Sequence, residues 1–390
     1  MKKLLLFTLV LLCIFAVSCG KNEENAKETN EIESTQKVEE TREPEQKPKL
    51  PDTEQTKTMK ELDGSFKTMG RSAFYDSSVS ADWSGCGIEF NAYCVGDVFV
   101  NVTLTKIEGR SGTPGTYLTV YIDGKRCEER LLASGGTNEI KIASDLTEGE
   151  HSFGIYRQTH NIHCNMLFDS IKMRGYLTEK PKDRDLYIEF LGDSITCGYG
   201  DIINPANDYS TFEYSDATSA YAFLCAEKLN ADYSILARCS WGIITADIED
   251  GNNIPDIYKY ICYSKNKTDF YDFENARKPD IVVINLGTND QKKLAEYGEE
   301  NYIKRTIEFV NDIRAKNTPD VPIIFVTNMM ADGCMKQLLT ATKQLGGEEN
   351  GIYFITMKQD RTGGGNHPSL QGQKLAADKL AKYIKETVLK

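Results

Sequence analysis

The sequence predicts two folded parts: an N-terminal all-β domain of jelly-roll or β-sandwich type, then an α/β domain with a parallel central sheet between two helical layers. Three observations support this. Apolar residues alternate with period two from about 62 to 178. After Pro181, buried strands alternate with helical periodicity. The length of 390 residues suits two average domains with a tail to spare. The predicted domains are 62–180 and 181–390.

The N-terminus has the pattern of an export signal. Lys2 and Lys3 precede the apolar run Leu4–Val17, which is too short to span a bilayer comfortably. The run ends in Ala16-Val17-Ser18-Cys19, and small residues before a cysteine resemble a bacterial lipobox. Cleavage there would leave a diacylated Cys19, and two acyl chains anchor a protein firmly. We therefore expect a lipoprotein signal peptide at 1–19 and a lipid-anchored protein of the cell envelope, outside the cytoplasm. An ordinary cleaved signal is the alternative, because Ala16 stands where Leu is usual.

Residues 20–61 are predicted to be a disordered, charged linker. Residues 20–60 contain 11 acidic and 8 basic side chains and no aromatic residue. Such a segment cannot bury enough apolar surface to offset the entropy of ordering the chain.

The β domain is predicted from short alternating segments with turns between them. Ile88–Tyr93, Val98–Val102 and Tyr117–Ile122 alternate, and Asp123-Gly124 supplies a two-residue hairpin turn. Further strands are expected near 139–142, 150–157 and 166–174.

The α/β domain is predicted from buried strands rich in Ile and Val, which is typical of parallel sheets. The expected strands are Tyr187–Leu191, 231–237, Asp280–Leu286, Val321–Thr327 and Ile352–Thr356. The expected helices lie near 217–229, 299–315 and 370–388.

Charge and cysteine content narrow the classes of partner and site. A net charge of −12 and a pI near 5.1 argue against nucleic acid or an anionic membrane surface as a partner.

Removing Cys13 and Cys19 leaves nine of the eleven cysteines, so at least one is unpaired. Five are expected to be buried thiols: Cys197, Cys225, Cys239, Cys262 and Cys334. The sequence allows one or two disulfides among four further cysteines but does not assign them: Cys86, Cys94, Cys127 and Cys164. Neither CxxC pairs nor zinc-type spacing occur, so we expect no metal.

Three short motifs follow predicted strands of the α/β domain. They are Gly192–Thr196, Leu286–Asp290 and Asn366–Ser369, and they bring a serine, an amide and a histidine. Ligands of open α/β sheets bind at the carboxyl ends of the strands, so these side chains are expected to converge. A nucleophile, a base and donors for an oxyanion are what acyl transfer to serine requires.

The histidine count selects one base for the serine. His151, His160 and His163 lie in the β-rich half, and His367 is the only histidine of the α/β half. If Ser194 has an imidazole base within its own domain, that base is His367. The alternative is a helix-start residue without a catalytic role.

These motifs carry a family resemblance. Residues from 181 onward resemble the SGNH (GDSL-type) hydrolases through Gly192–Gly200, Gly287–Asp290 and His367-Pro368-Ser369. With Trp83–Phe90 in the β domain, the chain from about 65 onward resembles carbohydrate esterase family 2, which joins a jelly roll to an SGNH domain. The resemblance implies a carboxylic ester hydrolase of acetyl xylan esterase type. Its expected substrates are acetylated polysaccharides or oligosaccharides such as xylan or glucomannan, and no cofactor is expected.

The resemblance also implies the roles of individual residues. Ser194 would attack the acetyl carbonyl while His367 takes its proton. The oxyanion would be held by the backbone N–H groups of Ser194 and Gly242 and by the side-chain amide of Asn289. Asp193 is expected to organise the turn.

One position departs from the SGNH pattern. The usual Asp three residues before the histidine is replaced by Gly364. A Ser–His dyad is therefore expected, in which a backbone carbonyl, that of Gly365, accepts the imidazole N–H. The side chain of Asp360 is the alternative.

Other functions stay open on the same scaffold, because a fold does not determine a substrate. A lipase, a thioesterase or a cell-wall O-acetylesterase is one alternative, and a non-catalytic carbohydrate-binding lipoprotein is another. The polar segment Asp201–Tyr214 favours sugar over lipid. Tyr199 and Trp241 are candidates either for stacking on sugar rings or for packing against the sheet.

Overall fold

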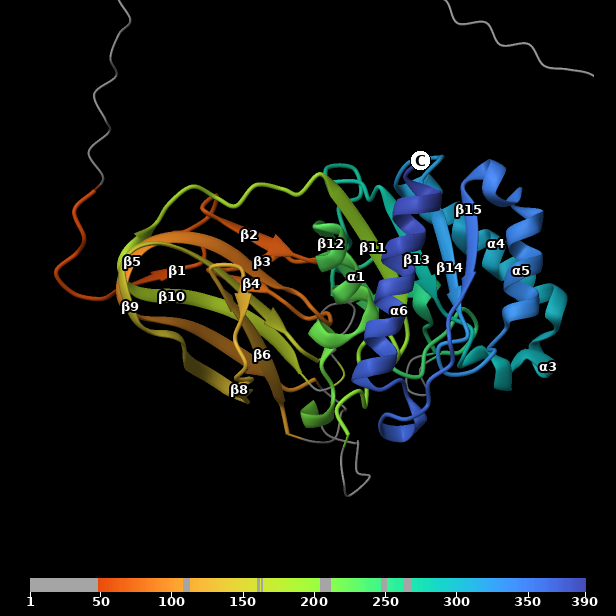
Figure 1. Cartoon of the computed structure of the whole chain (residues 1–390), viewed down its shortest axis with the longest axis horizontal. Helices are drawn as coiled ribbons and strands as arrows, with labels where there is room; N and C mark the ends of the chain where they lie inside the picture. The colour runs from red at the N-terminus through yellow and green to blue at the C-terminus, as the bar shows by residue number, and fades with distance from the viewer. Residues whose placement is uncertain are drawn as a thin grey trace, which may run out of the picture. The chain divides into compact units, whose positions relative to one another are not determined.

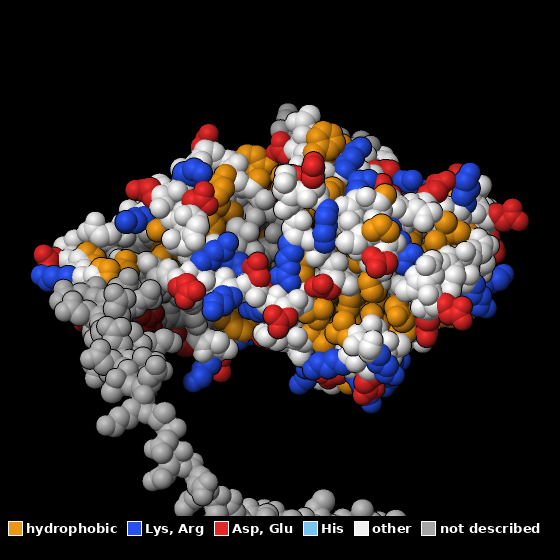
Figure 2. Space-filling view, turned by 90° about the horizontal axis from the view of Figure 1, so that it is seen from above, with side chains coloured by type: hydrophobic (Ala, Val, Ile, Leu, Met, Phe, Trp, Pro, Cys, Tyr) orange, Lys and Arg blue, Asp and Glu red, His pale blue; other side chains and the backbone are white. Residues whose placement is uncertain are grey.

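The computed structural model describes residues 48–390, apart from 108–112, 160–161, 163, 204–211, 247–250 and 263–267. Residues 49–390 form one compact unit (Figure 1). The predicted signal peptide, Cys19, and residues 20–47 of the predicted linker lie outside the described residues. Figure 2 shows Lys, Arg, Asp and Glu side chains interspersed over the face it presents.

The first domain is all-β, as predicted, and its paired strands run antiparallel. Its described strands form one hydrogen-bonded network in the order β3-β4-β10-β5-β9-β6-β7, with β1 on β10, β2 on β5 and β8 on β6. The strands are β1 (Gln55–Thr58), β2 (Phe66–Met69), β3 (Phe74–Tyr75), β4 (Ser78–Ser80), β5 (Gly87–Thr105), β6 (Gly115–Ile122), β7 (Lys125–Arg126), β8 (Leu131–Ser134), β9 (Gly136–Arg157) and β10 (Asn165–Leu177).

Strand β5 is longer than predicted because it joins two alternating segments. Its even-numbered apolar side chains are buried on both sides of an irregular stretch, from Ile88 to Cys94 and from Val98 to Leu104. The register against β9 shifts between Cys94 and Phe99, which bends the pair while the same parity keeps facing the core. In the same way β9 joins the strands predicted at 139–142 and 150–157.

The folded part begins earlier than the predicted boundary at residue 62. Strand β1 lies within the predicted linker 20–61 and pairs with Ser170–Met173 of β10, and Met59 is fully buried. The side chains of β1 are polar and mostly exposed, so their composition resembles that of a linker. Backbone pairing, which composition does not report, places this segment in the sheet.

The second domain contains a parallel sheet whose described strands have the order β12-β11-β13-β14-β15 (Figure 1). The strands are β11 (Leu186–Gly192), β12 (Ala231–Ala237), β13 (Ile281–Asn285), β14 (Ile323–Thr327) and β15 (Ile352–Thr356). The strand order reverses between β11 and β13, and in doubly wound sheets ligands bind at such a switch point.

Helices cover both faces of this sheet, as predicted. They are α1 (Tyr221–Leu229), α2 (Ile254–Ile257), α3 (Leu294–Tyr297), α4 (Glu299–Lys316), α5 (Met335–Gln344) and α6 (Leu370–Tyr383), the last continued by a π-turn to Val388. In β13, Val282 and Ile284 share a core with α4 and α5, whereas Val283 packs with α1 and α6. A strand buried on both faces explains the run of apolar residues.

Buried ion pairs join the two domains. Arg71, which follows β2, lies 2.9 Å from Glu189 of β11, and the two side chains are 0% and 3% exposed. The guanidinium stacks on three rings, and Tyr258 donates a 2.6 Å hydrogen bond to the same glutamate. A second buried ion pair between the domains joins Lys67 of β2 to Asp232 of β12 at 2.5 Å. The domains are therefore fixed to one another by desolvated charges.

The nine cysteines of the described ranges are thiols outside any disulfide, and seven of them are buried. The five cysteines expected to be thiols are thiols, with Cys239 only partly buried, and the four candidates for disulfides are also unpaired. Within the described part of the chain, no helix is long and apolar enough to cross a membrane.

Candidate active site

The serine and the histidine predicted from sequence lie in contact. Ser194 follows β11, and His367 lies between β15 and α6. The distance between Ser194 Oγ and His367 Nε2 is 2.8 Å. Strand ends that are far apart in the chain thus bring a hydroxyl and an imidazole within hydrogen-bonding distance at one edge of the sheet.

The turn that carries Ser194 is held by its neighbours. Asp193 Oδ1 accepts a 2.9 Å hydrogen bond from the N–H of Ile195, and the backbone carbonyl of Asp193 accepts one from Cys197. Glycine is required at 192 because a Cβ there would lie 2.0 Å from the Thr196 hydroxyl. The strand therefore ends in a tight turn that fixes the direction of the serine side chain.

Two backbone carbonyls orient the histidine ring. His367 Nδ1 lies 3.2 Å from the oxygen of Gly364 and 3.2 Å from that of Gly365. A carbonyl only accepts hydrogen bonds, so in the neutral ring Nδ1 carries the hydrogen and Nε2 presents its lone pair to the Ser194 hydroxyl. The expected carbonyl of Gly365 is in place, and that of Gly364 is a second acceptor that the sequence did not indicate.

The glycine run before the histidine is packed tightly against the first loop. Gly364 N–H donates a 2.6 Å bond to the carbonyl of Gly200, and a Cβ on Gly200 would lie 2.5 Å from the Gly364 oxygen. Gly365 has a φ of 59°, in the left-handed region that glycine adopts without a Cβ penalty. The ring of Tyr199 meets the imidazole edge-on at 5.0 Å.

The side chain of Asp360, the alternative acceptor for the ring, is bonded to other groups. Its Oδ2 accepts hydrogen bonds from the N–H and hydroxyl of Ser369, and its Oδ1 accepts from the N–H and hydroxyl of Thr362. Burial works to raise the pKa of Asp360, but these hydrogen bonds hold the pKa below its ordinary value. The carboxylate braces the start of α6, where Ser369 is the N-cap.

The environment of His367 favours the neutral base. Partial burial lowers the pKa of its imidazole below the ordinary value, and the bonds to the Gly364 and Gly365 carbonyls offset part of that effect. The unprotonated form that can accept a proton from serine is thus the favoured form at neutral pH.

Asn289 reaches the same edge of the sheet from β13. Its Nδ2 donates a 2.8 Å hydrogen bond to the carbonyl of Trp241 and a longer 3.3 Å bond to Asp193 Oδ2. The amide is thus held beside the turn of the serine. Burial, followed by the charge of Asp290, raises the pKa of Asp193 to about 7.

Gly242 differs from its expected role as a free donor. Its N–H donates a 2.9 Å hydrogen bond to the carbonyl of Thr245, within its own loop. The reason for glycine here is space, since a Cβ would lie 2.1 Å from Asp290 Oδ1. That carboxylate accepts hydrogen bonds of 2.8–3.0 Å from the N–H groups of Ile243, Ile244 and Thr245.

Asp290 is therefore a residue of the candidate site whose role the sequence did not indicate. It is the last member of the Gly287–Asp290 motif, and that position directly after Asn289 was the only available signal. The loop 242–245 and the carboxylate that binds it are more than 40 residues apart in the chain, so only the folded structure reveals their contact.

The two aromatic candidates have different surroundings. Trp241 is 1% exposed and packs against Arg238, so it belongs to the packing of the sheet edge. Tyr199 is partly exposed and contacts the catalytic candidate His367. Most of the polar segment Asp201–Tyr214 lies outside the described residues.

Comparison with known families matches both domains. Residues 188–380 match the GDSL-like lipase/acylhydrolase family, and residues 68–181 match the carbohydrate esterase 2 N-terminal domain. The two matches follow one another along the chain and meet at the boundary between the domains.

Among curated proteins, the chain is similar to a cellulase/esterase, CelE, of Acetivibrio thermocellus. The two are 28% identical over 331 residues, which is 81% of this chain and 39% of that protein. It is also similar to an acetylxylan esterase/glucomannan deacetylase of Cellvibrio japonicus, at 27% identity over 52% of this chain and 60% of the relative. The chain thus matches less than two thirds of the length of either relative.

Among solved structures, the chain is similar to a family two carbohydrate esterase from Clostridium thermocellum in complex with cellohexaose. The TM-score is 0.73 and the identity 25%, over 82% of this chain and 98% of that chain. The arrangement of a β domain followed by an α/β domain is therefore shared across almost the whole of that structure.

Proposed function

Because the chain belongs to the GDSL hydrolases that carry a carbohydrate esterase 2 N-terminal domain, we propose that it hydrolyses O-acetyl esters of polysaccharides or oligosaccharides of the xylan or glucomannan kind. The observation that carries the proposal is the 2.8 Å contact of Ser194 Oγ with a histidine whose other nitrogen faces carbonyl oxygens. The names of the two curated relatives support the choice of carbohydrate esters.

The proposed reaction has two stages. Ser194 Oγ attacks the acetyl carbonyl carbon while His367 Nε2 takes the hydroxyl proton. The bond from the carbonyl carbon to the sugar oxygen breaks, and His367 returns the proton to that oxygen. Water, deprotonated by the same imidazole, then attacks the acetyl-serine, which releases acetate and restores the hydroxyl.

The negative charge on the carbonyl oxygen requires donors at the moment of attack. We assign this role to the N–H of Ser194 and to the Asn289 amide, which would exchange its longer 3.3 Å bond to Asp193 for the oxyanion. Losing one such donor typically costs about 3–4 kcal/mol of transition-state stabilisation. Gly242 would join them only if its bond to Thr245 opened.

Acetate release by residues 49–390 tests the proposal, since this range is the compact unit that includes β1. Wild type and Ser194→Ala are compared on acetylated xylan, acetylated glucomannan and a short aryl acetate. We expect release by the wild type and a loss of about 10⁴-fold or more in the variant. Binding of polysaccharide without release of acetate by the wild type would instead indicate a non-catalytic carbohydrate-binding protein.

We further propose that the protein is a lipoprotein anchored to a bacterial membrane through Cys19. The support is the sequence Ala16-Val17-Ser18-Cys19 after an apolar run. The full chain is expected in the membrane fraction, and Cys19→Ala is expected to move it to the soluble fraction. Ser18→Ala, which keeps a small residue before the cysteine, is the matched control. Equal membrane association of Cys19→Ala and wild type would contradict the lipid anchor.

A further inference from the structure

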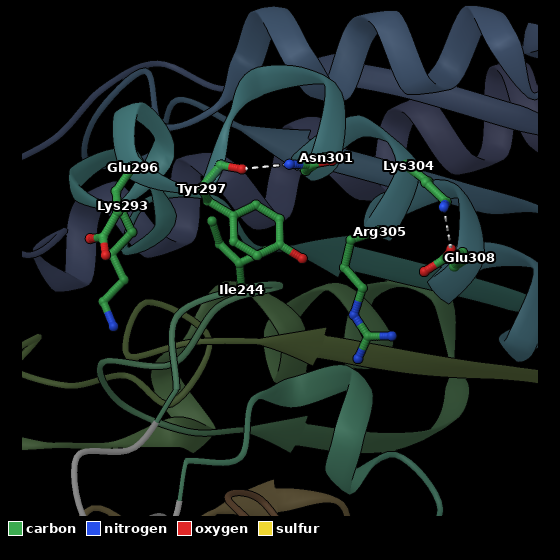
Figure 3. A pocket seen from close by; sticks show the side chains of 8 residues that line it. All are labelled: Ile244, Lys293, Glu296, Tyr297, Asn301, Lys304, Arg305 and Glu308. Carbon is green, nitrogen blue, oxygen red and sulfur yellow. Dashed lines mark hydrogen bonds and ion pairs between the residues drawn. The ribbon is translucent and has the colours of Figure 1, made fainter.

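A pocket of about 560 Å³ lies between the loop that follows β12 and the helices that follow β13 (Figure 3). One wall is the loop that follows β12, and the other wall is formed by α3 and α4. It is lined by Ile244, Lys293, Glu296, Tyr297, Asn301, Lys304, Arg305 and Glu308. Its volume lies within the range of about 300–1,000 Å³ that is usual for small-molecule sites.

The pocket shares its wall with the loop at the oxyanion donors. Ile244 lies two residues after Gly242, and its N–H donates a 3.0 Å hydrogen bond to Asp290 Oδ1. Asp290 directly follows Asn289 and begins the segment that leads into α3. The loop 242–245 and the segment that follows Asn289 thus contribute both to the candidate active site and to the wall of this pocket.

Tyr297 gives the pocket an aromatic surface. Its side chain is 42% exposed at the end of α3, and Figure 3 shows its ring in the middle of the pocket, between Glu296 and Arg305. A tyrosine ring has an apolar face and a polar hydroxyl. A sugar ring has C–H groups on its face and hydroxyls at its rim, which matches both.

The polar lining is ordered by contacts of its own. Arg305 donates a 2.8 Å hydrogen bond to Asp256 of α2, which holds its guanidinium in place. Asn301 Nδ2 donates a 2.9 Å bond to the backbone carbonyl of Tyr297. Lys304 and Glu308 are 4.0 Å apart. The bonds of Arg305 and Asn301 thus order part of the lining before a ligand binds, whereas the pair of Lys304 and Glu308 is exposed to solvent.

The charges of the lining are mixed in sign. Three cationic side chains, Lys293, Lys304 and Arg305, stand with two carboxylates, Glu296 and Glu308. An anionic ligand would meet the carboxylates, whereas sugar hydroxyls both donate and accept hydrogen bonds. The lining therefore suits an uncharged, polyhydroxylated ligand.

We propose that this pocket is an accessory subsite for a neutral sugar unit next to the one that carries the scissile acetyl group. The inference rests on the proposed function for its substrate class. Tyr297 supplies the stacking surface, and Arg305 and Glu308 are positioned to bond sugar hydroxyls.

Binding tests the subsite without requiring hydrolysis. In the full chain carrying Ser194→Ala, calorimetry with acetylated glucomannan oligosaccharide is compared with and without Tyr297→Ala. We expect the Kd to rise by roughly 3- to 30-fold when the ring is removed. Tyr297→Phe keeps the ring and should restore most of the affinity. Phe74→Ala, which removes an aromatic ring that is 38% exposed in β3, is the matched control.

Kinetics separate this inference from the proposed function. For kinetics, Tyr297→Ala is made in the protein that keeps Ser194. The ratio of kcat/KM for the oligosaccharide to kcat/KM for an aryl acetate should then fall by the same factor as the affinity. An unchanged Kd and an unchanged ratio would overturn the subsite while leaving the esterase intact. Tighter binding of an oligosaccharide of uronic acids than of the neutral one would overturn the choice of ligand. A wild type that binds the oligosaccharide but hydrolyses no ester would refute only the proposed function.

Discussion

His367 is oriented by backbone oxygens, and its pKa sets the pH range of the proposed reaction. Because burial lowers that pKa, the neutral imidazole persists to lower pH than in an exposed histidine. We expect kcat/KM for an aryl acetate to rise with pH, with a midpoint below the ordinary histidine value of about 6.5. A pH–rate profile of residues 49–390 measures this midpoint, and a value at or above 7 would contradict it.

A second group titrates in the same region and has to be separated from the histidine. Asp193 has a pKa of about 7 and accepts a hydrogen bond from Asn289. The profile of Asp193→Asn lacks this ionisation. If His367 is the base, the rise at acidic pH remains in the variant, although the maximal rate changes.

Asp360→Asn distinguishes a bracing carboxylate from a catalytic one. The amide would place an N–H group against the Ser369 N–H, so we expect a loss of about 1–2 kcal/mol in the free energy of unfolding. The carbonyls of Gly364 and Gly365 still orient the ring, so kcat is expected to stay within a few-fold of wild type. A fall in kcat on the order of 10³ without loss of structure would mean that Asp360 acts on His367.

Sequence was informative where a residue's role follows from its chemistry and its place after a strand. Ser194 and His367 could be paired because the α/β half offers one histidine. The second carbonyl at the ring and the closed hydrogen bond of Gly242 could not be predicted, because both depend on the paths of loops. Backbone atoms are the same in every residue, so sequence does not mark which of them face a site.

The loop after β12 is held by one carboxylate, that of Asp290, in the segment that follows β13. Asp290 Oδ1 accepts from the N–H groups of Ile244 and Thr245, and Oδ2 accepts from that of Ile243. Asp290→Ala leaves three N–H groups without this acceptor, at about 1–3 kcal/mol for each that stays buried. We expect a loss of several kcal/mol in stability and of at least 10²-fold in kcat/KM.

Asp290→Asn is the graded control for this element. An amide oxygen in the place of Oδ1 keeps two of the three bonds and turns a donor toward Ile243. Stability and activity should lie between those of wild type and Asp290→Ala, as measured by urea unfolding and by hydrolysis of an aryl acetate. Equal activity of all three proteins would show that the loop does not support catalysis.

At the level of elements, prediction succeeded for strands that form a clear apolar run and failed for helices that lack a start signal or a full helical period. The strands 231–237 and 352–356 are observed with the predicted bounds. Helix α5 was missed, and its N-cap residue, Cys334, makes no side-chain capping bond, so the usual start signal is lacking. The short helices α2 and α3 have four residues each, too few for a helical period to be recognised.

The whole molecule is held together by charges buried between its two domains. Glu189→Gln would leave Arg71 buried without its counter-ion, and removing one partner of such a pair costs about 3–5 kcal/mol. We expect a loss of that size in the free energy of unfolding, measured by denaturant titration. Lys382→Ala, which breaks an exposed pair 3.9 Å apart, is the matched control and should change stability by less than about 0.5 kcal/mol.

The two tryptophans show whether the domains unfold together. Trp83 lies in the β domain and Trp241 in the α/β domain, and they are the only tryptophans of the chain. Variants that keep one tryptophan each should give coincident fluorescence transitions, because the interface joins both cores. Two separate midpoints would show that each domain is stable without the other.

The carbonyl-held imidazole changes where this fold is vulnerable to mutation. In a protein with a Ser-His-Asp triad, replacing one acidic residue removes the group that aligns the ring. Here the aligning atoms are backbone oxygens, so a substitution at Gly364 or Gly365 does not delete them. The sensitive positions are instead Gly200 and Gly365, where an added methyl group would meet a carbonyl or strain a left-handed backbone. Under the proposed mechanism, a screen for inactivating substitutions would therefore find the positions that align the ring among glycines, not among acids.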